Sequence, residues 1–129
     1  MRPAPTAPAP TVSQRYSIAL DMAHNGKPGA ARVLYQQLAR DDLSENRRAD
    51  LHAELPNYPS PQALKLADAD LHNDSPLVRE AAIRSIVGLV PNAQRTLLLG
   101  PLLDDPEQRV RFAAANALLG LSPDEQGLY

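Results

Sequence analysis

The clearest pattern in the chain lies between residues 76 and 90, where apolar side chains recur with the period of an α-helix. On a helical wheel of about 100° per residue, Val78, Ala82 and Leu89 fall on one side. Ile83 and Ile86 widen this side beyond the stripe that a helix with one neighbour needs. The pattern therefore predicts a helix that contacts other helices on two sides.

Prolines and capping residues divide the rest of the chain into further helical segments. Ser60-Pro61 and Ser75-Pro76 each combine an N-cap residue with a first-turn proline, and Asn25-Gly26 suits a helix end. Seven helices are predicted, at about 12–24, 28–40, 45–55, from 61, from 76, at 92–104 with a kink at Gly100-Pro101, and at 107–120. The connections are short, so consecutive helices should be antiparallel.

Two of these helix pairs are copies of each other. Residues 61–92 match residues 93–124 without a gap when shifted by 32 positions, and ten positions are identical. A fainter copy, in which Arg47 matches Arg79, covers about 28–59. The predicted organisation is a linker at 1–11, a leading helix at 12–27, a degenerate repeat at 28–59, repeats at 60–91 and 92–123, and a tail at 124–129.

Each full repeat has an acidic turn, a Val-Arg pair, a double alanine and a closing Gly-Leu. The first three features are seen in Asp74-Ser75-Pro76-Leu77-Val78-Arg79-Glu80-Ala81-Ala82 and in Asp105-Pro106-Glu107-Gln108-Arg109-Val110-Arg111-Phe112-Ala113-Ala114. The closing pair follows at Gly88-Leu89 and at Gly120-Leu121. The pattern resembles the short bacterial HEAT-like repeat, the type also found in phycobilin lyases. The resemblance implies an all-α fold, a right-handed α-solenoid of about three HEAT-like helix pairs preceded by one helix. The Thr-Pro-Leu-His turn of ankyrin repeats and the aromatic positions of tetratricopeptide repeats are absent.

The composition favours closely packed helices and excludes several classes of protein. The 129 residues include 20 Leu and 20 Ala but one Phe and no Trp, which argues against a sandwich or barrel. A net charge of −2 argues against a strongly basic nucleic-acid binder. No apolar run approaches the roughly 18 residues of a membrane span. The absence of cysteine excludes disulfides, thiolate metal sites and cysteine nucleophiles.

The first ten residues contain four prolines, alternating mostly with alanine, and are expected to form a semi-rigid spacer. They have no apolar core, so they are not expected to be a signal peptide. A spacer usually has a domain on each side. We therefore expect the chain to be preceded by a further segment in its natural context.

The polar residues give no pattern typical of a catalytic or metal site. The three histidines are His24, His52 and His72. They are too far apart for a local metal motif, and we expect them to be solvated or at turn ends. Asp68 and Asp70 are expected on an exposed helix edge and Asp74 in a turn, because the glycine and glutamate of a calcium loop are missing. We therefore expect no catalytic residue, no metal and no cofactor.

The most regular charges are Arg79 and Arg111. The resemblance implies that they bind acidic turn residues of their own or the next repeat. The paired carboxylates Asp41-Asp42 and Asp104-Asp105 lie in predicted turns, where helix capping explains them.

One surface is more apolar than a solvated face requires. The only Phe lies on the side of the seventh helix that is expected to be concave and exposed. We assign a partner-binding surface to Arg84, Val87, Phe112, Asn116 and Leu119. The seventh helix also lacks the polar stripe of a terminal repeat. We therefore expect the chain to self-associate through this helix or to belong to a longer array.

The sequence predicts a non-enzymatic scaffold that binds a protein partner, without nucleic acid or membrane insertion. One alternative is an enzyme, since bilin lyases and an alkylpurine DNA glycosylase family use related helical repeats. Another alternative is a fragment of a periplasmic multihaem cytochrome assembly, which the spacer and the Val-Arg units resemble. No haem-binding Cys-x-x-Cys-His occurs in this stretch. The compartment stays open, with the periplasm favoured by this resemblance.

Overall fold

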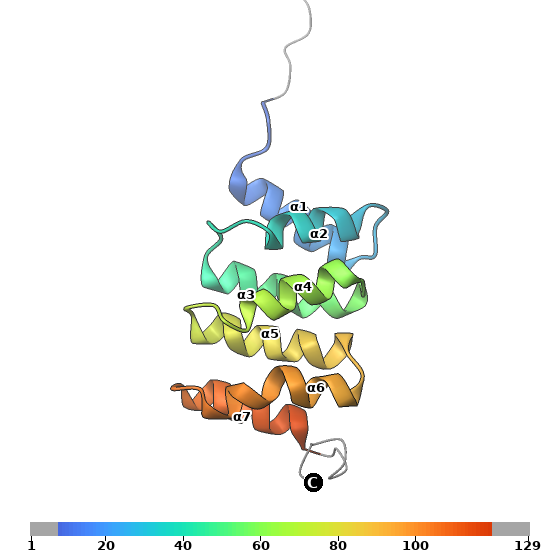
Figure 1. The fold of residues 1–129 in the computed structure, drawn as a ribbon. Coiled ribbons are helices and arrows are strands. Elements are labelled where there is room, and N and C mark those ends of the chain that lie inside the picture. Colours follow the sequence, from blue (N-terminus) through green and yellow to red (C-terminus); the bar gives the residue numbers. More distant parts are fainter. Residues whose placement is uncertain (1–7, 120–129) are drawn as a thin grey trace, which may run out of the picture.

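The computed structural model describes residues 8–119 of the chain, and its regular elements in this part are all helices, with no strand (Figure 1). Its α-helices are α1 (Val12–His24), α2 (Ala30–Leu38), α3 (Glu45–Glu54), α4 (Pro61–Asp70), α5 (Pro76–Leu89), α6 (Asn92–Leu99) and α7 (Gln108–Leu118). Two short 3-10 helices are η1 (Leu55–Asn57) and η2 (Gly100–Asp104). The predicted all-α class is confirmed for these residues. The first seven residues of the predicted linker and the tail at 124–129 lie outside the described part.

The helices begin where the capping residues predict. The side chains of Ser44, Ser60 and Ser75 each accept a hydrogen bond from the backbone N–H three residues later. At the end of α1, Asn25 is the C-cap and Gly26 has a left-handed φ of +62°, which glycine adopts without strain. All seven α-helices begin within two residues of their predicted starts. These boundaries are set locally, by groups within one turn of each helix end.

The kinked helix predicted at 92–104 is instead divided into two elements. α6 ends at Leu99, and the chain continues as the 3-10 helix η2. Pro101 has no N–H to donate to the carbonyl of Leu97, and its ring crowds that turn, so the α-helical pattern stops. The last residue of the predicted seventh helix, Gly120, lies outside the described residues.

The odd-numbered helices form a row in the order α1, α3, α5 and α7, each packed on the next. In Figure 1 this row runs from top to bottom, and the even-numbered helices α2, α4 and α6 lie in front of it. α5 packs on α3, α4 and α7, which confirms the prediction that this helix has neighbours on two sides. The two ends of the described chain consequently lie at opposite ends of the stack.

The core between the helices consists mainly of leucine and alanine. Ala82 and Ala114, the repeat alanines, are fully buried, as are Leu34, Leu51 and Leu99. Small side chains at such positions let helix backbones approach closely. Within residues 8–119, no helix combines the length and apolarity that crossing a membrane would require.

A second close approach lies at the C-terminal end of α5. A Cβ atom added to Gly88 would lie 2.6 Å from Cβ of Pro56 in η1. This distance is far below van der Waals contact, so the glycine lets η1 pack directly against α5.

Candidate functional site

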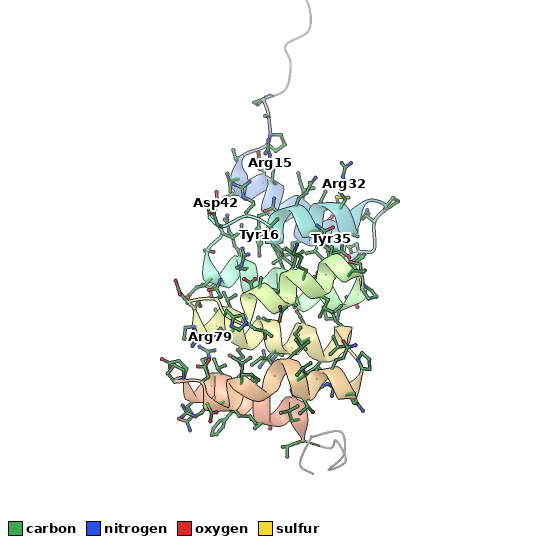
Figure 2. All side chains as sticks on the ribbon, in the orientation of Figure 1. Arg15, Tyr16, Arg32, Tyr35, Asp42 and Arg79 are labelled. Carbon is green, nitrogen blue, oxygen red and sulfur yellow. The ribbon has the colours of Figure 1, made fainter. Side chains whose placement is uncertain are left out.

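The first feature is a pair of repeat arginines, Arg79 and Arg111, that bind the turns between helices. Arg79 donates from Nε and Nη2 to the carboxylate of Asp105, at 2.9 and 3.0 Å. Its Nη1 donates to the carbonyl oxygens of Asn73 and Asp74, in the turn before α5. The role predicted for Arg79 is therefore confirmed. Arg79 lies at the edge of the stack, where α5 begins (Figure 2). Arg111 makes the equivalent backbone contact, to the carbonyl of Asp105 at 2.7 Å.

In the first repeat, Arg48 plays this part, and the sequence alignment with Arg47 was wrong by one residue. Arg48 donates to the carbonyls of Leu38 and Arg40 and, from Nε, to Asp70 at 2.8 Å. It stands four residues after the N-cap Ser44, as Arg79 stands four after Ser75. The spacing between these repeats is therefore 31 residues. Arg47 instead stacks over the ring of Tyr16, 4.9 Å from its centroid.

Two predictions about polar residues are wrong, because His52 and Asp70 are buried. Nε2 of His52 lies 2.6 Å from Oδ2 of Asp70, and Arg48 donates to the same oxygen. A buried carboxylate is tolerated when a cation and hydrogen-bond partners surround it, and here Arg48 and the ring of His52 do so. The other histidines agree with prediction: His24 and His72 are exposed. Asp68 is half-buried, and Asp74 is exposed in its turn.

His52, Asp70 and Ser85 resemble a Ser-His-Asp arrangement but cannot act on a substrate. Nδ1 of His52 lies 3.3 Å from Oγ of Ser85. However, that hydroxyl donates to the backbone carbonyl of His52 at 2.7 Å, and Ser85 is fully buried. A nucleophile must reach the reacting atom, and this one is sealed beneath the helices. The cluster therefore holds α3, α4 and α5 together.

The two carboxylates that receive these arginines are held in their ionised form. Burial by itself would raise the pKa of Asp70, but His52 and Arg48 outweigh it and hold the pKa below the usual carboxyl range. For Asp105 burial also acts upward. The hydrogen bonds from Arg79 and from the Glu107 N–H, together with the positive charges of Arg79 and Arg111, outweigh burial and lower the pKa. Both groups therefore contribute to stability at neutral pH.

The described residues contain no group of three or more histidine, aspartate or glutamate side chains that could hold a metal ion. His24 contacts one carboxylate, Oε1 of Glu54, at 3.1 Å. A metal site needs more ligands than this pair supplies.

The residues assigned to a partner-binding surface lie mostly around one groove. Between α5 and α7, a surface groove of about 470 Å³ is lined by Arg84, Val87, Phe112 and Asn116. We call it the arginine groove. Phe112 is 58% exposed, although it is the largest apolar side chain of α7. Leu119, the C-cap of α7, is 69% exposed and does not line the groove.

Two charged residues of this groove, Glu80 and Arg109, were not predicted. Glu80 accepts hydrogen bonds from Arg84 and from Arg109, each at 2.8 Å. The positive charge of Arg109 and its position on the helix are the signals that could have placed it at the groove. Its partner Glu80, however, is 29 residues away in the sequence. The structure also limits the uncovered apolar area of α7, because Val110 and Leu118 are buried. The exposed apolar residues of α7 and its cap are Phe112 and Leu119.

The same side of the helical row carries two further grooves. The groove between α1 and α3, which we call the acidic groove, has a volume of about 500 Å³ and is lined by Asp21, Asp50 and Glu54 above Leu20 and Ala53. A smaller middle groove lies between α3 and α5. Asp50 and Ala53 line both the acidic and the middle groove, whereas Glu80 and Arg84 line both the middle and the arginine groove. The three grooves therefore form one continuous surface, which we call the row face.

Comparison with known proteins found no match: no family model, no curated protein and no solved structure is similar enough to this chain.

Proposed function

We propose that this protein is a non-enzymatic protein-interaction scaffold, built as a right-handed α-solenoid of HEAT-like helix pairs. Two features support the solenoid. The odd-numbered helices pack in chain order, each on the next. Arg48 and Arg79 each reach from their own helix pair to a carboxylate of the following one, Asp70 and Asp105. Repeated contacts between neighbouring units are what stabilise a solenoid.

The observation that carries the interaction function is the exposed Phe112 in the arginine groove. Aromatic and arginine side chains are enriched in the cores of protein interfaces. Here Phe112 stands beside Arg84 and Arg109, over an apolar floor that includes Ile83 and Val87. A polypeptide that covered this groove would remove the aromatic ring from water. Burying so large an apolar surface favours binding.

The end of the row supports the same function. Arg111 repeats the backbone contact of Arg79, but within residues 8–119 no carboxylate binds it. In the two preceding helix pairs, such a carboxylate comes from the next unit. The face of α7 that ends at Leu119 is therefore suited to a further polypeptide, either a continuation of the array or another molecule.

Site-specific photo-crosslinking in the source cell tests this proposal. A photoreactive amino acid at Asn116 should yield discrete crosslinked products, because that residue lines the groove. The same amino acid at Gln36, an exposed position on α2, is the matched control. Phe112→Glu in the Asn116 background should abolish the products without changing the helical circular dichroism. Equal crosslinking at the two positions, or none at Asn116, would contradict the proposal.

A further inference from the structure

The two ends of the row face carry opposite charge. The acidic groove is lined by the exposed Asp21 and Asp50 and by Glu54, of whose side chain 15% is exposed. No Arg or Lys is among its described lining residues. Glu54 contacts His24, and Asp50 accepts a hydrogen bond from Tyr16 at 3.2 Å. Asp21 is bound by the side chain of Asn25, which is uncharged. No arginine or lysine side chain pairs with any of the three carboxylates in this part of the chain.

The arginine groove at the other end has the reverse balance. Arg84 and Arg109 share one carboxylate, that of Glu80, so one positive charge is left over. Both side chains extend into solvent, with 74% of Arg84 and 54% of Arg109 exposed. Phe112 lines the same groove.

We propose that the occupant of the row face is a second copy of this chain, bound face to face and antiparallel about a two-fold axis through the middle groove. This proposal rests on the proposed interaction function and names its partner. A two-fold interface is self-complementary: a residue at one end meets its counterpart at the other end, twice. The acidic groove of each copy would thus meet the arginine groove of its partner.

The middle groove permits this arrangement. Three of its lining residues, Ala49, Ala53 and Ala81, have small side chains. The others include Asp50 on the α3 side and Arg84 on the α5 side, so the two-fold axis would bring opposite charges together there as well. Arg84 and Arg109 of one copy would face Asp21 and Glu54 of the other. Phe112 would enter the acidic groove, above its apolar floor of Leu20 and Ala53. At each end of the interface an apolar contact would thus be surrounded by charge pairs. An apolar core with a polar rim is the usual arrangement of a protein interface.

A parallel arrangement would place like charges opposite each other, because acidic groove would meet acidic groove. Like charges at an interface oppose association. The charge pattern therefore favours the antiparallel dimer, and it predicts that high salt weakens self-association.

Charge exchange between the two grooves tests the arrangement in sedimentation equilibrium over a concentration series. Copy one carries Asp21→Arg and Glu54→Arg, and copy two carries Arg84→Glu and Arg109→Glu. Each copy alone should self-associate at least about tenfold more weakly than the wild type, because like charges then meet twice. A 1:1 mixture should recover the dimer, because both contacts then pair opposite charges. Arg32→Glu, at an exposed position of α2 outside the row face, also reverses a charge and should leave the dimer intact.

Circular dichroism checks that each copy is folded, and Arg84→Gln with Arg109→Gln replaces copy two if the glutamates disturb Glu80. The neutral variant should also weaken the dimer, by less. Three results would each overturn the proposal. They are a wild type that stays monomeric at high concentration, larger open-ended assemblies, and a dimer whose affinity the charge exchange does not change. Groove-specific crosslinks to a different protein from Asn116, together with a monomeric wild type, would overturn the dimer while leaving the interaction function supported.

Discussion

Helices α5 and α7 hold equivalent places in the repeat but have different surroundings. α5 lies between α3 and α7, and its Ile83 is fully buried. The equivalent residue of α7 is Ala115, which is half-buried because no described helix follows. Glu80 on α5 is likewise replaced by Phe112 on α7, and that ring is exposed. The same local pattern thus produces a core helix inside the row and an exposed aromatic surface at its end.

This difference shows what a repeat pattern controls. The pattern fixes which side of each helix faces the core, since Val78 and Val110, like Ala82 and Ala114, are buried in both copies. It does not fix what covers the remaining sides, because a neighbour supplies that cover. The surface available to a partner is therefore decided by position in the row.

The largest expected difference between the two helices concerns their arginines. Arg79→Ala leaves the buried carboxylate of Asp105 with only the Glu107 N–H among its described donors, and should lower the free energy of unfolding by about 3 kcal/mol. Arg111→Ala removes a backbone hydrogen bond and should cost about 1 kcal/mol. Urea unfolding followed by circular dichroism measures both values. Equal losses would mean that the bridge to Asp105 adds no stability.

Ala82 and Ala114 test the feature that the two helices share. Replacing either by Leu should cost about 1–3 kcal/mol, because the added side chain has no room between the helices. Arg84→Leu, on the exposed side of α5, is the matched control and should change stability by less than about 0.5 kcal/mol. The same unfolding measurement applies. A large effect at Arg84 with none at the alanines would reverse the assignment of inner and outer sides.

The C-terminal end of α5 gives a smaller effect. Gly88→Ala should destabilise the fold by about 1 kcal/mol, since the contact with the rigid ring of Pro56 outweighs the helix propensity gained. Gly100→Ala has open space around its new Cβ, so it should be neutral or stabilising. Thermal unfolding of the two variants separates these cases. A more stable Gly88→Ala protein would show that η1 can move away from α5.

The smallest effect is a pH dependence. The pKa values of Asp70 and Asp105 are lower in the folded protein than in the unfolded chain, where an aspartate titrates near about 3.9. Their stabilisation is present above that pH and is lost as the pH falls through the folded values. Arg79→Ala should therefore make the stability less sensitive to acid. Unfolding free energies at a series of acidic pH values test this, and an unchanged slope in the variant would contradict it.

The helices, and the residue pairs that line the arginine groove, can be predicted from local sequence. N-cap residues such as Ser60 and Ser75 act within one helical turn, so the start of each helix can be predicted from a few neighbouring residues. The apolar period of α5 likewise identified its buried side, and helical geometry placed Arg84 with Val87 and Phe112 with Asn116. The tertiary structure then brought these two pairs to one groove.

Which polar residues are buried and which charges meet depends instead on tertiary packing. His52 and Asp70 are 18 residues apart, and each has the sequence surroundings of an exposed residue. Arg48, rather than Arg47, binds Asp70 because one residue fewer separates the first repeat from the second. Glu80 and Arg109 meet only because α5 and α7 pack side by side. The burial of a polar side chain and the pairing of two charges depend on which distant helices become neighbours. The periodicity of residues within one helix does not contain that information.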